Sequence, residues 1–347
     1  MAREKIISQE ALGPDDENLN VALRPQSLDT CIGMRDLIEK LSISIQASLQ
    51  REEPMEHVLL HGPPGLGKTT LAYVIAHEMG STIKVTSGPS LTRATDLIGI
   101  LTSLEHGDVL FIDEIHRLSA TVEEYIYPAM EDYKVDFVVD SGMHSRTINL
   151  PLKPFTLIGA TTRSGMLSPP LRTRFGISHH MDFWSIDDLY QRGKMSADML
   201  GMQYDEQALK MLATRARGTP RIANRLLRRC RDYAQVKGNG RLTEQCVADA
   251  LKLEGIDILG LDELDRRFLK TIMGVYKGGP VGIEAVAATL GEETDTLVDV
   301  VEPYLLQTGM LARTRRGRTV TSKACQHLGV KYIEPEGTQT GLFDTDE

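Results

Sequence analysis

The sequence predicts an α/β P-loop domain with a parallel sheet and flanking helices, followed by a small all-helical domain and a C-terminal winged-helix domain. Three observations predict this order. A glycine-rich loop separates an apolar strand pattern from a helical pattern near residue 65. Helical periodicity fills 184–256, and three helical patterns followed by two short strand patterns fill 257–333. The large domain is then 1–183, mobile over 1–20, and 334–347 is an acidic disordered tail.

The composition is that of a globular protein, and a chain of 347 residues is too long for one ordinary core. No apolar run approaches the about 20 residues that cross a bilayer, and the N-terminus lacks a signal-peptide pattern. We therefore expect a cytoplasmic protein without membrane contact. The scattered cysteines argue against a zinc site and a disulfide framework. A net charge of −9 does not exclude nucleic acid, because one basic face is enough for binding.

The glycine-rich loop, Gly62–Thr70, has the G-x-x-x-x-G-K-T pattern. Glycines at these positions permit backbone conformations that turn successive N–H groups toward a β-phosphate beside a helix N-terminus. Lys68 adds a positive charge, and Thr69 offers a hydroxyl to Mg²⁺. The sequence therefore predicts nucleotide binding by Gly65, Gly67, Lys68, Thr69 and Thr70.

Two apolar strand patterns end in polar side chains. The unbroken run 109–112 is typical of a parallel strand buried on both faces, and it ends in Asp113 and Glu114. Asp113 would hold Mg²⁺ through water, and Glu114 would orient and deprotonate the attacking water. An acidic strand cap in solvent is the alternative. The second run ends in two threonines, and we choose Thr162 ahead of Thr161 as the hydroxyl that contacts the γ-phosphate or the lytic water.

Two arginines are candidate phosphate ligands. Arg174 ends a short helical pattern and is either a solvated cap or a charge that stabilises phosphoryl transfer in a neighbouring subunit. Thr219 suits the N-cap and Pro220 the first position of the next helix, so Arg221 lies in a first turn whose free N–H groups can face the same anion. The later arginines of that helix are expected on a basic solvent face: Arg225, Arg228, Arg229 and Arg231.

Two strand pairs are candidate surfaces. Val135–Met143 and Thr147–Leu150 predict a hairpin whose consecutive apolar residues are either buried on both faces or form an exposed docking surface, and burial is favoured. The last two strand patterns flank a tip with no acidic residue, which favours phosphate contacts with weak sequence preference over a merely solubilising loop. Its arginines are Arg313, Arg315, Arg316 and Arg318.

The succession of P-loop, Asp-Glu strand, threonine-tipped strand, Arg174 and Arg221 resembles the AAA+ ATPases. Within that class, the chain resembles the RuvB family, the bacterial motors of Holliday junction branch migration. The resemblance spans about Leu23 to Gly329. The segments on which it rests are 23–25, 62–70, 111–118, 129–132, 159–163, 218–229, 279–282 and 313–318.

The resemblance implies a hexameric ring on double-stranded DNA, recruited to four-way junctions by RuvA and working with the RuvC resolvase. Hydrolysis of ATP, with Mg²⁺, would drive branch migration in recombination and repair. Arg174 would be supplied in trans, Arg313 and Arg318 would touch DNA, and the hairpin Phe137–Ile148 would dock RuvA, which reverses the preference for burial. Further implied nucleotide contacts are Leu23, Arg24, Glu131, Asp132, Tyr133 and Trp184.

Some positions depart from the family pattern. Met143-His144-Ser145 replaces small residues and proline, Trp184 replaces a tyrosine, and Leu189–Leu200 diverges, so the choice of a RuvA partner stays open. A protein-remodelling or clamp-loading AAA+ machine would share the motifs through Arg221, but the arginine tip argues against it. A non-hydrolysing DNA-binding regulator is disfavoured by Glu114. The tail segment Gln339–Phe343 resembles peptides that dock on bacterial sliding clamps.

Overall fold

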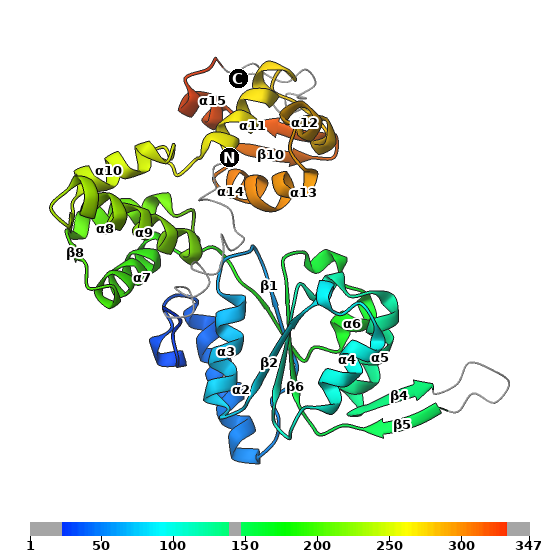
Figure 1. Cartoon of the computed structure of the whole chain (residues 1–347). Coiled ribbons are helices and arrows are strands. Elements are labelled where there is room, and N and C mark those ends of the chain that lie inside the picture. Colours follow the sequence, from blue (N-terminus) through cyan, green and yellow to red (C-terminus); the bar gives the residue numbers. More distant parts are fainter. Residues whose placement is uncertain (1–22, 139–146, 332–347) are drawn as a thin grey trace, which may run out of the picture. The chain divides into compact units, whose positions relative to one another are not determined.

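The structure is a computed structural model that describes residues 23–138 and 147–331. The described residues cluster into two compact units. Figure 1 shows the elements of both, coloured from blue to red along the sequence. The first, here the sheet unit, comprises 23–199 and 218–221. The second, here the C-terminal unit, comprises 200–217 and 222–331. Most residues of the predicted helical domain, 200–217 and 222–256, cluster with the C-terminal residues, and the boundaries of the three predicted domains stay a prediction.

The sheet unit contains a five-stranded parallel sheet in the order β2-β3-β6-β1-β7. The strands are β1 (Val58–His61), β2 (Ile83–Ser87), β3 (Val109–Asp113), β6 (Thr156–Thr161) and β7 (Ile177–His180). The α/β fold class is therefore confirmed, although β7 was not predicted. Because the strands are parallel, their carboxyl ends meet at one edge, where His61, Asp113 and Thr161 end neighbouring strands.

Helices cover both faces of this sheet (Figure 1). They are α2 (Arg35–Arg51), α3 (Lys68–Glu78), α4 (Ala94–Thr102), α5 (Ala120–Glu131) and α6 (Pro169–Thr173), with 3-10 turns at η1 (Leu28–Thr30), η2 (Gly88–Ser90), η3 (Ile115–Arg117) and η4 (Ser164–Met166). Helix α7 (Ile186–Met199) ends the first range of this unit and contributes no residue to the two cores of the sheet. Leu60 and Phe111 pack with α2 and α3 on one face. Leu59 and Leu110 pack with α4 and α5 on the other. Alternate strand residues thus belong to opposite cores, as expected for a sheet buried on both sides.

A separate two-stranded ribbon pairs β4 (Lys134–Val138) with β5 (Thr147–Pro151) in antiparallel register. Ile148 and Leu150 are 50% and 37% exposed. The preference for burial on both faces is therefore wrong at Ile148 and Leu150, whereas Val135 of β4 is fully buried in the core. The predicted turn, including Met143-His144-Ser145, lies outside the described residues.

The C-terminal unit begins with a helical segment. It contains α8 (Glu206–Arg215), α9 (Pro220–Lys237), whose first two residues belong to the sheet unit, and α10 (Glu244–Leu253), with a two-stranded pairing of β8 (Gln203–Tyr204) and β9 (Arg241–Leu242). As predicted, α9 begins at Pro220, and Ile222, Leu226 and Cys230 are buried. Arg225 is only 4% exposed. The predicted basic solvent face is therefore wrong at this position, since α9 is buried on more than one side.

The remaining elements form the predicted winged helix. They are α11 (Glu263–Gly274), α12 (Ile283–Leu290), α13 (Thr294–Thr296), the π-helical turn η5 (Leu297–Val301), α14 (Glu302–Gln307), β10 (Leu311–Thr314), β11 (Gly317–Val320) and α15 (Ser322–Leu328). The strands pair antiparallel around Arg315 and Arg316. Gly317 has φ 137°, and a Cβ there would lie 2.4 Å from the Val281 carbonyl oxygen, so the close approach requires glycine.

Within 23–138 and 147–331, no helix combines the length and apolar character that a membrane span needs. The tail segment Gln339–Phe343 lies outside these ranges.

Candidate functional site

The glycine-rich loop connects β1 to α3, as the sequence predicted, and its glycines have left-handed backbone angles. Gly62, Gly65 and Gly67 have φ of 144°, 78° and 108°. A Cβ on Gly62 would lie 2.3 Å from the Met181 carbonyl oxygen, and one on Gly65 would lie 2.7 Å from Thr219 Cγ2. Gly67 meets no neighbour within 4 Å, so its φ alone favours glycine. The loop therefore turns its amides at the N-terminus of α3, where an anion binds well.

Lys68 is the first residue of α3 and is 7% exposed. Its Nζ donates to the carbonyl oxygens of Gly62 and Pro63, at 2.8 and 2.9 Å. Burial lowers the pKa of Lys68 to about 8, although Glu114 and Asp113 oppose that shift. A bound phosphate would favour the charged form of this lysine.

Glu114 lies just beyond β3 and is held by three groups. Its Oε2 accepts from the Thr162 hydroxyl at 3.0 Å and from the Thr162 amide at 3.3 Å, and lies 3.2 Å from His116 Nδ1. Burial alone would raise the pKa of Glu114, but these hydrogen bonds outweigh it and lower the pKa. Glu114 also has φ 46°, which is uncommon for any residue other than glycine. Backbone angles of this kind are found most often at functional sites. The carboxylate is therefore ionised and fixed.

Asp113 ends β3, and its Oδ1 accepts from the Glu114 amide at 3.0 Å. Burial raises the pKa of the Asp113 carboxyl, as does the neighbouring Glu114. Thr69 and Asp113 offer only hard oxygen donors. No cluster of three or more His, Cys, Asp or Glu suited to a metal occurs in the described ranges. This donor set fits Mg²⁺, which usually takes one or two protein ligands and completes its shell with phosphate and water.

Sequence reasoning missed His116, which lies in the turn η3 directly after Glu114. Besides its contact with Glu114, its Nδ1 lies 2.8 Å from the Thr161 hydroxyl. The two threonines thus have different partners, since Thr162 contacts Glu114 directly and Thr161 contacts His116. A histidine two residues after a candidate general base was the available signal.

Arg221 and Trp184 both lie at the glycine-rich loop. A Cβ on Gly65 would lie 3.5 Å from Arg221 Cβ, so the first turn of α9 packs against the loop. Trp184 Nε1 donates to the Leu66 carbonyl oxygen at 3.3 Å. The sheet edge therefore brings together Lys68, Asp113, Glu114, Thr162 and Arg221, with Trp184 beside them.

The other implied nucleotide contacts lie in different surroundings. Leu23 is 2% exposed, and its carbonyl oxygen accepts from Arg192. The Arg24 guanidinium lies 4.6 Å from the centroid of the Tyr73 ring on α3. Asp132 pairs with Lys134, and the Tyr133 ring packs edge-on against Phe155 at 5.9 Å.

Arg174 caps α6 and forms a second group with Glu131. Its Nη1 donates to the Pro170 carbonyl oxygen at 2.7 Å, and its Nη2 lies 3.1 Å from Glu131 Oε1. The guanidinium also lies 4.4 Å from the centroid of the Tyr127 ring. An arginine held in this way keeps a defined orientation.

Three family models together match almost all of the described chain. They are the "Holliday junction DNA helicase RuvB P-loop domain" over 23–181, the "RuvB AAA lid domain" over 184–257 and the "RuvB C-terminal winged helix domain" over 258–329. The chain belongs to the RuvB family.

RuvB relatives match over nearly their whole length. The Holliday junction branch migration complex subunit RuvB of Dehalococcoides mccartyi is 53% identical over 341 residues, which are 98% of this chain and 97% of the relative. That of Desulfosudis oleivorans is 56% identical over 311 residues, 90% and 91% of the two chains. The solved RuvB Holliday junction branch migration motor of Thermotoga maritima is 51% identical with a TM-score of 0.82, covering 89% of this chain and 99% of that one.

The arginine-tipped hairpin of this RuvB family member divides into two kinds of arginine. Arg313, Arg315 and Arg316 are exposed. The Arg318 side chain is only 11% exposed and makes a two-point ion pair with Glu302, at 2.5 and 3.1 Å. The sequence showed no acid within the tip, but Glu302 comes from the start of α14. The Arg318 guanidinium therefore pairs with a buried carboxylate, unlike the three exposed arginines.

Proposed function

We propose that this protein hydrolyses ATP to drive branch migration of Holliday junctions, as a hexameric ring on double-stranded DNA. The observation on which the proposal rests is the meeting of Lys68, Glu114 and Thr162 at one sheet edge, in a RuvB family chain that also ends in an arginine-tipped hairpin. Binding alone would need the lysine, whereas hydrolysis needs the ordered glutamate as well.

In the proposed mechanism, Glu114 accepts a proton from the attacking water. The Thr162 hydroxyl and amide orient its carboxylate, and the same hydrogen bonds keep it ionised at neutral pH. Lys68 and the loop amides balance phosphate charge, and Arg221 approaches from the first turn of α9. Thr69 and Asp113 would hold Mg²⁺, whose contribution is to neutralise charge on the phosphate oxygens.

Arg174 is proposed to act on the ATP of a neighbouring subunit. Its ion pair with Glu131 and its stacking on Tyr127 support a guanidinium held ready for a partner's phosphates. An arginine of this kind raises the rate of phosphoryl transfer by about 10³–10⁵ where it has been measured. Turnover should therefore depend on assembly.

The partners follow from surfaces of the described chain. The exposed Arg313, Arg315 and Arg316 support contacts with DNA phosphates. The exposed Ile148 and Leu150 support docking of RuvA on the ribbon β4–β5. RuvC, as the resolvase of the same assembly, and a sliding clamp at Gln339–Phe343 remain proposals from the sequence.

ATP turnover by the full chain tests the proposal. It is measured alone, with linear duplex, with synthetic four-way DNA, and finally with RuvA added, while strand exchange of the four-way DNA is followed. We expect DNA to stimulate turnover, with the largest stimulation and junction movement in the presence of RuvA. A protein that stays monomeric and ignores DNA at low ionic strength, with ATP and Mg²⁺ supplied, would contradict the proposal.

A further inference from the structure

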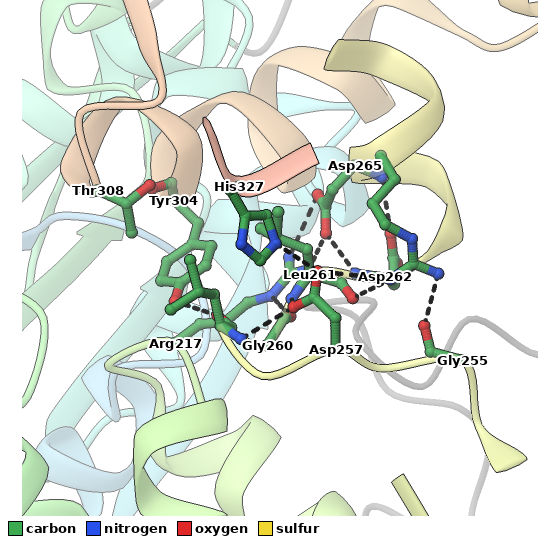
Figure 2. A network of polar contacts seen from close by, with 12 residues as sticks. Arg217, Gly255, Asp257, Gly260, Leu261, Asp262, Asp265, Tyr304, Thr308 and His327 are labelled. Atoms are coloured by element: carbon green, nitrogen blue, oxygen red, sulfur yellow. Dashed lines mark hydrogen bonds and ion pairs between the residues drawn. The ribbon is translucent and has the colours of Figure 1, made fainter. Parts of the chain in front are cut away.

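Arg217 is a buried arginine that the proposed chemistry does not use. It lies between α8 and α9, has φ 54°, and is 2% exposed. Figure 2 shows its guanidinium directed into the winged-helix part of the C-terminal unit. Nε donates to the Gly260 carbonyl oxygen at 2.7 Å, and Nη2 donates to Asp265 Oδ2. The guanidinium also lies 5.0 Å from the centroid of the Tyr304 ring.

These contacts reach three elements that follow in the chain. Gly260 belongs to the connector between α10 and α11, here residues 255–262. Asp265 lies in the first turn of α11, is 1% exposed, and also accepts from the Asp262 amide at 2.8 Å. Tyr304 belongs to α14 and donates its hydroxyl to the Leu259 carbonyl oxygen at 2.6 Å. One guanidinium thus holds the connector, α11 and α14 together.

The connector is held along its length, so it does not behave as a loose linker. Asp257 Oδ1 accepts from the amides of Leu259 and Leu261, both at 2.9 Å. Asp257 Oδ2 lies 2.8 Å from His327 Nε2. Arg266 donates to the carbonyl oxygens of Leu261 and Gly255, at 2.7 and 2.8 Å. The connector is thereby tied to α11 through Arg266 and to α15 through His327.

Arg217 also adjoins the candidate nucleotide site along the chain. Only three residues, Gly218–Pro220, separate it from Arg221, and four residue steps span at most about 14 Å. Within the sheet unit, Thr219 is fully buried and packs with Arg221 against Gly65 of the glycine-rich loop. The segment 217–221 is therefore held at the glycine-rich loop by Thr219 and Arg221, and in the winged helix by Arg217.

We propose that Arg217 is the positioning residue that couples the nucleotide site to the winged helix, by fixing the chain next to Arg221 to α11 and α14. This inference rests on the proposed function, which needs some route by which ATP hydrolysis moves the DNA-binding arginines. A displacement of the turn 218–221 moves Arg217, and the buried ion pair moves Asp265 with it. The coupling is reciprocal, so DNA bound at the winged helix alters nucleotide affinity.

A test of this proposal must remove the Arg217–Asp265 ion pair without leaving one of its charges buried and unpaired. Burial lowers the pKa of Arg217 to about 10, opposed by Asp262, Tyr304 and Asp257, so the guanidinium is charged at neutral pH. Loss of one partner would leave the other charged and buried, which destabilises a fold strongly, whereas apolar replacement of both is often tolerated. The test variant is therefore Arg217→Met with Asp265→Leu in the full chain.

The first measurement is the affinity for a non-hydrolysable ATP analogue with and without linear duplex. We expect DNA to change the affinity of the unaltered chain at least about fivefold, and that of the double variant by less than about twofold. We expect ATP turnover without DNA to stay within about twofold, and junction migration per ATP to fall at least about fivefold. A matched control, Arg241→Met with Asp205→Asn, removes an ion pair of 2.6 Å inside the helical segment and should leave the coupling intact.

Equal coupling in the double variant and the unaltered chain would overturn the inference, as would absence of coupling in the unaltered chain. If the double variant does not fold, Tyr304→Phe removes only the hydroxyl donation to Leu259, and we expect a partial loss of coupling; an unchanged value would again overturn the inference. Failure of the unaltered chain to move four-way DNA with RuvA would instead reject the proposed function. The affinity measurement would still test Arg217 in that case.

Discussion

The Thr162 hydroxyl donates a hydrogen bond of 3.0 Å to Glu114 Oε2, and the Thr162 amide contacts the same oxygen at 3.3 Å. The residue directly after β6 therefore orients the carboxylate that directly follows β3. Because β3 and β6 are neighbours in the sheet, the orientation is set by strand register and does not depend on a flexible loop. The predictions about hydrolysis follow from this contact.

Glu114→Gln should abolish ATP hydrolysis and leave ATP binding intact. The amide cannot accept the proton of the attacking water, and a general base of this kind contributes about 10²–10⁴-fold. Steady-state turnover and equilibrium binding of labelled ATP measure the two effects. Glu105→Gln, at an exposed residue paired with Lys153, is the control. Retained turnover in the Glu114 variant would reject its assigned role.

Thr162→Val should lower kcat more than it changes KM. The variant keeps the amide contact but loses the hydroxyl, so Glu114 is less well oriented, and we expect kcat to fall about 10–100-fold. Thr102→Val, which removes a surface hydroxyl that bonds within α4, should have no effect. A rise in KM with kcat unchanged would indicate that Thr162 only helps to bind ATP.

Nucleotide binding should take up protons at alkaline pH because of Lys68. Burial holds its pKa near 8 in the free protein, and a triphosphate favours the charged form and so raises the pKa in the complex. Between the two pKa values, affinity should fall as pH rises, by at most about tenfold per pH unit. Calorimetry of nucleotide binding in buffers of different ionisation enthalpy measures this proton uptake. We expect clear uptake at pH 8.5 and almost none at pH 6.5.

Lys68→Arg provides the control for that experiment, since a guanidinium keeps its proton throughout this range. Proton uptake that persists in this variant would assign the effect to another group.

The arginines of the C-terminal hairpin should separate into two classes. Arg313→Ala with Arg316→Ala should weaken DNA binding and reduce the slope of log K against log salt by about one per arginine. Arg318→Ala should mainly destabilise the fold, because it leaves the buried Glu302 without its partner at a cost of about 3–5 kcal/mol. Salt titrations and chemical denaturation measure these effects. An unaltered salt slope for the first variant would contradict DNA contact by the hairpin tip.

Local patterns predicted the features that depend on local chemistry. The loop at Gly65, the strand ending at Asp113 and the helix start at Pro220 follow from periodicity, glycine geometry and capping, and the structure has them at the expected residues. The predicted α/β fold class is confirmed for the same reason. Strand β7, with its short and weakly apolar sequence, gave no comparable signal.

Contacts between distant residues could not be predicted in this way. Arg318 was grouped with the hairpin tip because Glu302 lies 16 residues earlier in the chain. His116 was overlooked because its role depends on Thr161, 45 residues later. Arg225 was expected in solvent because arginine is a charged residue. The position is nevertheless buried by the packing of neighbouring elements.

The central claim, that ATP is hydrolysed between neighbouring protomers to move a junction, is tested most directly by mixing two inactive variants. In an equimolar mixture of Glu114→Gln and Arg174→Ala chains, random assembly into a ring gives intact sites at roughly a quarter of the interfaces. We predict that the mixture recovers roughly that fraction of ATP turnover, together with migration of four-way DNA in the presence of RuvA. A mixture that stays as inactive as each variant alone would contradict the account.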